Sequence, residues 1–198
     1  MEKKTQNKVI REVIEWFLYL FSAFIIASIL HTQVFAMTVV DQSSMEDTLI
    51  EGQKLVMERI SYKIHEPMRG DIIVFLQKEE TDGILERVKI FFNDIRLKLK
   101  KQNREDRMIK RVIAVGGDEL TIKGGYVYVN GEKMEEQYIK TLTPNEIVTE
   151  IVPEGYVYVM GDNRAISEDS RYYGPIKLDH IEGKVVFRLL PINEMGKP

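Results

Sequence analysis

The pattern of hydrophobic and polar positions divides the chain into an apolar N-terminal segment and a longer remainder. Residues 16–30, WFLYLFSAFIIASIL, contain no charged side chain, and after three polar residues the apolar run resumes as VFAM and ends at Met37. A helix over residues 16–37 is long enough to cross the roughly 30 Å hydrocarbon core of a bilayer. The pattern therefore predicts a transmembrane anchor over residues 16–37, preceded by a tail at residues 1–15.

The charges of the tail favour one orientation of this anchor. Cationic side chains outnumber acidic ones there, with Lys3, Lys4, Lys8 and Arg11 against Glu2, Glu12 and Glu15. Because cytoplasmic flanks carry the excess of Lys and Arg, we expect a cytoplasmic N-terminus and an extracytoplasmic domain over residues 38–198. A cleaved signal peptide and a buried helix are the alternatives. Residues 32–34 lack a small-residue cleavage pattern, however, and the segment lacks the polar stripe of a packed helix.

Beyond the anchor, the pattern is that of short strands separated by turns. The runs are rich in Val, Ile, Tyr and Phe, which favour strands. They cover residues 54–60, 71–76, 108–115, 126–131, 155–161 and 184–190. Asn130-Gly131 stands between apolar residues, the strongest short signal for a hairpin. We therefore predict a mostly β domain over residues 38–198.

One segment of this domain has helical rather than strand periodicity. Residues 84–101, ILERVKIFFNDIRLKLKK, place apolar side chains at helical spacing and basic ones mostly on the other faces. The apolar positions are Ile84, Val88, Phe91, Ile95 and Leu99. The segment predicts an inserted basic amphipathic helix. Two interpretations remain open: the apolar stripe packs on the sheet, or the helix lies on anionic lipid.

The composition excludes several classes of function. A formal net charge of −3 gives no basic field for nucleic acid, and the absence of cysteine removes disulfides, thiolate metal sites and a cysteine nucleophile. The motifs of zinc proteases, α/β-hydrolases, phosphate-loop NTPases and EF-hands are absent. We therefore expect no metal, no cofactor and no nucleic-acid partner.

A serine hydroxyl needs a neighbouring base, and lysine is the better candidate for that base. His31 lies in the apolar segment, and His65 and His180 lie in polar stretches outside any nucleophile–base motif. Lys110 shares one strand face with apolar neighbours two residues away on each side, so burial is expected to lower its pKa. Arg111 is flanked in the same way but stays protonated and cannot be a base. From the residues alone, Lys110 and Arg111 are each more often a snorkelling residue or half of an ion pair than a catalytic group.

Four stretches resemble, in the same order, the signature boxes of bacterial type I signal peptidases. They are Ser44-Met45, RGDIIVF at 69–75, KRVIAVGGD at 110–118 and GDNRAISEDSRYYG at 161–174. The last stretch is long and specific, whereas a Ser-Met pair alone is weak. The resemblance covers nearly the whole of the predicted extracytoplasmic part. It implies a signal-peptidase-like β-fold with a Ser/Lys peptidase site, held in the cell membrane by a single-pass anchor.

The resemblance also implies roles for individual residues. Ser44, rather than Ser43, is the nucleophile, because in the family methionine follows the catalytic serine directly. Lys110 is the general base that later protonates the leaving amine, and Ser167 orients its amine through a hydrogen bond. Met45 contributes to substrate binding.

Further residues are implied to support this pair. Asp169 and Arg171 form an ion pair, and Asp162 belongs to the same network. The backbone N–H of Ser44 and the side-chain amide of Gln42 are the oxyanion donors. Residues 69–71 are expected to shape the entry to a strand.

Two positions depart from the family pattern. Asp47 stands where the family usually has proline, which could loosen the loop that carries the nucleophile. Gln42 stands where the family usually has serine or glycine. These departures put the substrate range in doubt more than the activity.

The function implied is that of signal peptidase I, a serine endopeptidase that removes signal peptides from exported preproteins. Its partners are those signal peptides, the lipid bilayer and, by proximity, the secretion translocon. The substrate binds extended beside a sheet edge, with small side chains at alternate positions as in Ala-x-Ala. One alternative is a pilus or secretion assembly factor, either non-catalytic or dedicated to pilins. A self-cleaving repressor-type peptidase is disfavoured by the anchor and by the lack of a DNA-binding domain.

Overall fold

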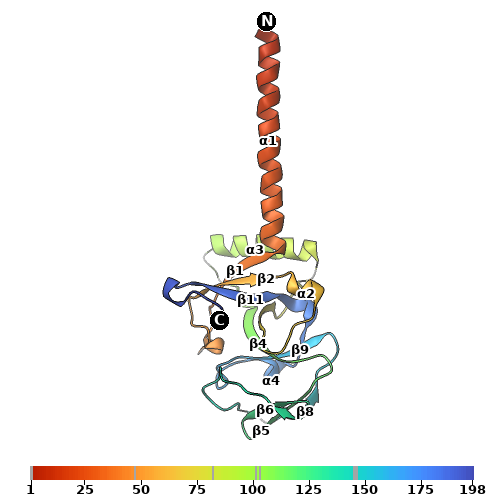
Figure 1. The fold of residues 1–198 in the computed structure, drawn as a ribbon, viewed down its shortest axis with the longest axis vertical. Coiled ribbons are helices and arrows are strands. Elements are labelled where there is room, and N and C mark those ends of the chain that lie inside the picture. Colours follow the sequence, from red (N-terminus) through yellow and green to blue (C-terminus); the bar gives the residue numbers. More distant parts are fainter. Residues whose placement is uncertain (1, 47, 82, 101, 103, 145–146) are drawn as a thin grey trace.

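A long helix joins a mostly β domain in the computed structural model (Figure 1). The structure describes residues 2–46, 48–81, 83–100, 102, 104–144 and 147–198, and the side chains of these except for 2–9, 28–33 and 147–148. Helix α1 covers Glu2–Gln33. The predicted anchor continued to Met37, but the last of its residues begin strand β1, Phe35–Val39. Within the described residues, no helix meets the length and apolarity needed to cross a membrane.

The larger sheet is antiparallel and has seven strands in the order β1-β2-β11-β3-β4-β9-β10. After β1, its strands are β2 Lys54–Glu58, β11 Ile181–Leu190, β3 Ile72–Leu76, β4 Arg107–Val115, β9 Tyr156–Met160 and β10 Ile176–Lys177. Every residue of β3 is buried, which fits its central position between β11 and β4. Strand β1 lies at an edge and pairs only with β2.

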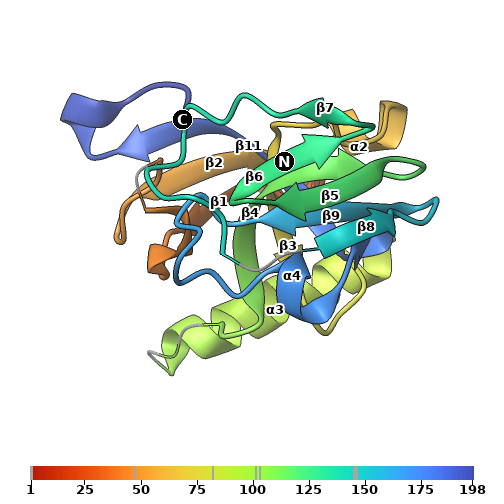
Figure 2. The same ribbon diagram turned by 90° about the horizontal axis from the view of Figure 1, so that it is seen from below.

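The smaller sheet has four antiparallel strands in the order β7-β6-β5-β8. The strands are β7 Glu132–Lys133, β6 Tyr126–Val129, β5 Glu119–Lys123 and β8 Ile147–Ile151. Asn130 and Gly131 turn β6 into β7 with φ angles of 54° and 79°, so the predicted hairpin is confirmed. This sheet lies at the end of the domain farthest from α1, and Figure 2 looks onto it.

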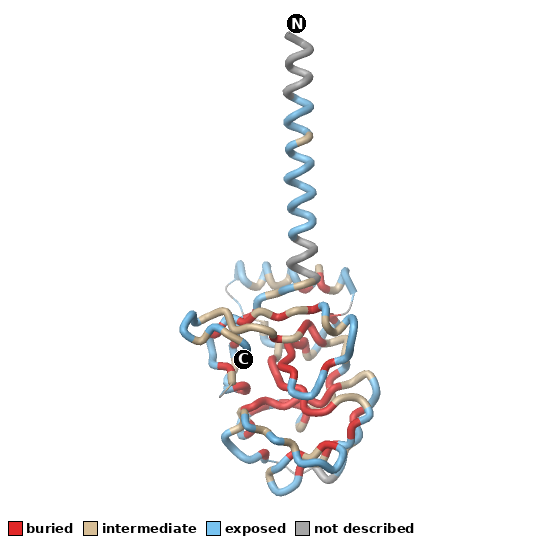
Figure 3. Tube along the Cα trace, viewed as in Figure 1, coloured by how far each residue is buried: buried red, intermediate tan, exposed pale blue. Residues whose placement is uncertain are grey.

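Three buried apolar clusters hold the domain together. One joins β2 and β3 to the loop after β1, and its members include Val40, Met45, Leu49, Leu55 and Ile72. A second joins the two sheets and a third fills the other side of β3, β4 and β9. Figure 3 shows that burial is concentrated in the β domain, whereas the described side chains along α1 are mostly exposed.

The remaining elements are short, apart from one helix of 16 residues. They are α2 Ser61–Ile64, α3 Ile84–Leu99, α4 Ser170–Tyr173, and the 3₁₀ turns η1 Ser43–Met45, η2 Leu178–His180 and η3 Ile192–Glu194. The helix predicted at 84–101 is therefore present as α3. The interpretation that its apolar stripe packs on the sheet is wrong, because Ile84, Ile95 and Leu99 of that stripe are exposed.

Candidate active site

Ser44 and Lys110 lie in contact at the centre of the domain. The Nζ atom of Lys110, on β4, is 2.7 Å from the Oγ atom of Ser44, in the turn η1. Lys110 is only 1% exposed and Ser44 only 9% exposed. Lys110 was expected to be buried between apolar neighbours, and its position on β4 opposite Ile73 provides this burial.

The turn that carries Ser44 is fixed by its neighbours on both sides. Gln42 is extended, with φ −136° and ψ 146°, and the chain then closes one 3₁₀ turn in which the Glu46 N–H donates to the Ser43 carbonyl. Met45 is fully buried in the cluster beside β2 and β3, and its carbonyl accepts from the Leu49 N–H at 2.8 Å. Met45 holds the turn in place from the core and also lines the cleft beside Ser44, and its role in substrate binding stays a prediction. Asp47 lies outside the described residues.

Burial lowers the pKa of Lys110 to about 8, because the low-polarity surroundings disfavour the ammonium form. The carboxylates of Asp169 and Glu168 oppose this shift from a distance, and burial outweighs them. Among the described residues, no carboxylate lies within ion-pair distance of the amine, which donates only to Ser44. At pH 7 about a tenth of the Lys110 side chains are then neutral and able to accept a proton.

Ser167 lies beside this pair but does not bond to it. Its side chain is buried, and within the described part of the chain its Oγ atom has no hydrogen-bond partner, so the predicted bond to the Lys110 amine is not formed. Ser167 instead packs against Gly161, where an added Cβ would collide with Ser167 Oγ and with the carbonyl oxygen of Ser44. Gly161 therefore allows the last signature stretch to approach the Ser44 backbone, a requirement that sequence reasoning missed.

The predicted ion pair between Asp169 and Arg171 is present and fully buried. Arg171 donates from Nε and Nη2 to the two carboxylate oxygens, each at 2.8 Å. Asp169 also accepts from the Gly161 N–H at 2.9 Å, and Arg171 donates to the carbonyls of Arg164 and Ser167. This pair therefore fixes the backbone of the last signature stretch rather than contacting the Ser44 or Lys110 side chains.

Asp162 belongs to a different network, so the prediction that it joins the Asp169–Arg171 pair is wrong. Its carboxylate accepts from Arg111 Nε and Nη2 at 2.9 and 2.7 Å and from Thr48 Oγ1 at 2.5 Å. The physical reason is strand alternation: Arg111 follows Lys110 on β4 and points to the opposite face. Arg111 and Thr48 were missed as supporting residues, although the flanking of Arg111 by apolar positions was a signal of burial.

Residues 69–71 shape the entry to β3, as expected. Gly70 has φ +90°, and Asp71 accepts from the Met68 N–H at 3.1 Å. Arg69 donates from Nε to Asp118 at 2.9 Å, away from Ser44. These contacts define the start of the strand, and they add no group to the Ser44–Lys110 pair.

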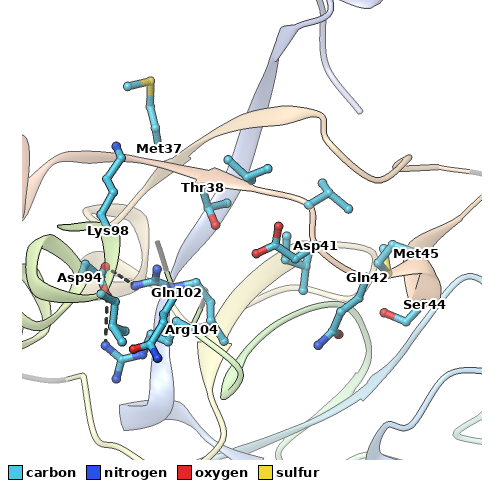
Figure 4. A pocket seen from close by; sticks show the side chains of 15 residues that line it. Met37, Thr38, Asp41, Gln42, Ser44, Met45, Asp94, Lys98, Gln102 and Arg104 are labelled. Atoms are coloured by element: carbon cyan, nitrogen blue, oxygen red, sulfur yellow. Dashed lines mark hydrogen bonds and ion pairs between the residues drawn. The ribbon is translucent and has the colours of Figure 1, made fainter. Parts of the chain in front are cut away.

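A cleft of about 520 Å³ opens beside Ser44. One wall is formed by β1 and the residues that follow it, and the other by α3 and the start of β4. Figure 4 shows Gln42 and Ser44 close together at one end, with Asp94, Lys98 and Arg104 at the other. A buried amine in contact with a serine hydroxyl, next to a cleft along a sheet edge, has the features of a serine peptidase whose base is a lysine.

Comparisons with known proteins agree with this class. The family described as "Signal peptidase, peptidase S26" matches residues 13–190. The chain is 35% identical over 175 residues to a probable signal peptidase I-2 of Synechocystis sp., covering 88% of this chain and 72% of that protein. It is 29% identical over 202 residues to signal peptidase IB of Staphylococcus aureus (strain COL), covering 93% of each. A crystal structure of a signal peptidase I from Enterococcus faecalis V583 aligns with a TM-score of 0.43 and 25% identity, over 61% of this chain and 97% of that chain. The family match over residues 13–190 and the relative with 35% identity show that the chain belongs to the signal peptidase family, peptidase S26.

Proposed function

We propose that this signal peptidase cleaves the signal peptides of exported preproteins with Ser44 as nucleophile and Lys110 as general base. The observation that carries the assignment is the 2.7 Å contact between Lys110 Nζ and Ser44 Oγ inside a buried site. The lowered pKa of Lys110, about 8, supports it because a neutral amine can accept the serine proton near neutral pH.

The first half of the reaction forms an ester on Ser44. Ser44 Oγ attacks the scissile carbonyl carbon while its proton passes to the neutral Lys110 amine. The Ser44 backbone N–H and the Gln42 side-chain amide donate to the oxyanion of the tetrahedral intermediate. Lys110, now an ammonium, gives its proton to the departing nitrogen as the C–N bond breaks. The mature protein leaves as an amine, and the signal peptide remains bound as an acyl ester.

The second half reverses these proton transfers with water. Neutral Lys110 takes a proton from a water molecule whose oxygen attacks the ester carbon. When the second tetrahedral intermediate collapses, the C–O bond to Ser44 breaks and Lys110 returns the proton to Ser44 Oγ. The signal peptide is released with a new carboxyl end, and both side chains regain their starting states.

The substrate binds as an extended strand in the cleft beside β1. This placement is supported by the position of β1 at the sheet edge, where it pairs only with β2, and by the cleft that β1 lines as far as Ser44. An edge strand offers backbone donors and acceptors to a peptide strand, and alternate side chains of that peptide point into the wall. Small residues at alternate positions, as in Ala-x-Ala, fit this mode of binding.

Helix α1 anchors the enzyme to the membrane as a single span, with residues 1–15 cytoplasmic and residues 38–198 extracytoplasmic. The proposal is supported by the large apolar side chains of Trp16, Phe17, Leu20 and Phe24, which are all exposed. Exposing large apolar side chains to water is unfavourable, whereas hydrocarbon accommodates them. This anchoring holds Ser44 near the surface at which a membrane-bound preprotein presents its cleavage site, close to the translocon.

The test is cleavage of a membrane-bound preprotein by the full chain in proteoliposomes. We expect Ser44→Ala, Lys110→Ala and Lys110→Arg each to lower turnover by at least about 10³-fold. Ser43→Ala is the matched control, since it removes the neighbouring exposed hydroxyl and should leave turnover unchanged. Sequencing the N-terminus of the product checks the cleavage site. An assembly factor predicts the opposite, namely that Ser44→Ala retains full function in the assembly of exported subunits.

A further inference from the structure

Helix α3 presents its apolar side chains away from the domain. Ile84, Leu85, Phe92 and Leu99 are 67%, 71%, 62% and 81% exposed. At 3.6 residues per turn these positions, together with Ile95, fall on one face of the helix. A helix that packs on a soluble domain turns its apolar stripe toward the core, so this orientation is the reverse of the usual one.

The opposite face of α3 is attached to the domain mainly by polar contacts. Arg87 is buried and donates from Nε to the Thr81 carbonyl at 3.1 Å. Asp94 accepts from Arg107 Nη2 at 2.8 Å, and the buried Ile90 adds an apolar contact. These contacts fix which way the helix faces, with the outer stripe exposed.

Basic side chains flank the outer apolar stripe. Lys89, Arg96 and Lys100 are exposed along one border of the stripe, and Lys98 is exposed along the other. Acidic side chains lie beside one of these cations: Glu86 is 3.8 Å from Lys89, and Glu79 and Glu80 line a hollow with the same lysine. An apolar face bordered by cations matches an anionic bilayer surface, in which apolar side chains enter below the headgroups and the cations meet the phosphates.

The position of α3 agrees with such a surface. Figure 1 shows α3 lying across the axis of α1, at the end of the domain where α1 enters, and the two helices contact each other. We propose that α3 is an interfacial helix whose outer face inserts into an anionic lipid bilayer. This inference rests on the proposed membrane anchoring by α1, because a spanning α1 places α3 at the bilayer surface.

The inner side of the same helix ties lipid contact to the substrate cleft. Asp94, Leu97 and Lys98 of α3 line the cleft that leads to Ser44. A bilayer that holds α3 therefore holds one wall of the cleft at the membrane surface. The cleft is then presented to a peptide that emerges from the lipid.

The test places an environment-sensitive fluorophore on α3. The chain contains no cysteine, so Phe92→Cys gives a single labelling site, and Lys123→Cys on the distant strand β5 is the matched control. Each labelled full-length chain is reconstituted into vesicles of phosphatidylcholine alone or with phosphatidylglycerol. We expect a blue shift and a several-fold gain in emission at position 92 in the anionic vesicles, with quenching by brominated lipid, and no change at position 123. The combined change of Lys89, Arg96 and Lys100 to Gln should remove the dependence on anionic lipid.

Other outcomes overturn the proposal in distinguishable ways. If the chain floats with the vesicles while a label at position 92 stays as solvent-exposed as one at 123, α3 does not enter lipid although α1 anchors the chain. If the emission at position 92 depends on the number of protein chains per vesicle and not on lipid charge, a second copy of the chain covers the outer face of α3. A chain that does not float with the vesicles contradicts both this inference and the anchoring by α1. Neither the fluorescence nor the flotation measurement requires catalysis, so each can be repeated with Ser44→Ala.

Discussion

Arg111 on β4 donates two hydrogen bonds, of 2.9 and 2.7 Å, to the carboxylate of Asp162 in the last signature stretch. Thr48, four residues after Ser44, donates to the same carboxylate. The Asp162 carboxylate therefore links three parts of the chain: the loop that follows Ser44, the strand β4 that carries Lys110, and the last signature stretch.

Removing one partner of this pair should destabilise the protein strongly. Asp162→Ala leaves the Arg111 guanidinium buried without its counter-charge, and we expect a loss of about 3–5 kcal/mol in the free energy of unfolding. Chemical denaturation of the variant measures this loss. Lys177→Ala, which breaks an exposed ion pair with Asp179, is the control and should barely move the midpoint. An Asp162→Ala variant as stable as the parent would show that the pair is not a structural fastening.

The rate of cleavage should rise with pH through about 8 and level off above it. The reason is that the proposed base is the neutral amine of Lys110, whose pKa is lowered to about 8 by burial. A pH–rate profile with a lipid-anchored preprotein measures the inflection. A profile that is flat from pH 6 to 9 contradicts a lysine base with this pKa.

Lys110→Met should stabilise the folded protein at neutral pH while it abolishes cleavage. The folded-state pKa of Lys110, about 8, lies below the usual value of 10.5, so the folded state disfavours the proton that the unfolded chain retains. The resulting cost, about 3 kcal/mol at most, is fully present below pH 8 and disappears as the pH rises from 8 toward 10.5. Thermal denaturation at pH 7 and at pH 10 should show a gain for Lys110→Met at pH 7 that shrinks at pH 10. Equal gains at the two pH values would count against the burial of a titrating amine.

Gly161→Ala should disrupt both stability and activity. The added Cβ would meet the Ser44 carbonyl oxygen and Ser167 Oγ, and relieving this overlap means moving the turn that carries the nucleophile. Overpacking of this kind costs about 1–3 kcal/mol. Ser167→Ala is the matched control for stability, because it removes a hydroxyl that has no partner among the described residues and adds no atom. Denaturation and turnover are measured for both variants, and a Gly161→Ala enzyme with parental turnover contradicts the close approach.

The periodicity of the sequence located most of the larger sheet but not its edge. Val, Ile and Phe runs identified β3 and β4, which are buried, whereas β1 was assigned to the anchor because its apolar residues continue the apolar run of α1. The polar residues 31–33 mark the end of the helix at Gln33, but the prediction treated them as an interruption within the anchor. The same limit applies to α3: spacing revealed its stripe, but only the contacts of its other face decide which way the stripe points.

The candidate site was predicted to the extent that it depends on residue type and motif. Lys110 was expected to be buried, and it contacts Ser44 as the resemblance implied. The partner of Asp162 could not be predicted, because its pairing with Arg111 depends on how β4 and β9 align and on which strand face each side chain takes. Ser167 shows the reverse case. The motif implied a hydrogen bond to the Lys110 amine, but the Ser167 hydroxyl packs against Gly161 and does not form that bond.

The junction between α1 and β1 consists of one residue, Val34, and its carbonyl accepts from the Arg59 N–H at 3.0 Å. Because this connection is short and is bonded to the domain, the direction of the helix sets the height and tilt of Ser44. With α1 embedded in the membrane, Ser44 would lie at a fixed distance from the bilayer surface. Preproteins whose scissile bond lies too close to the lipid, or too far from it, would be passed over even when their sequence at the bond is ideal.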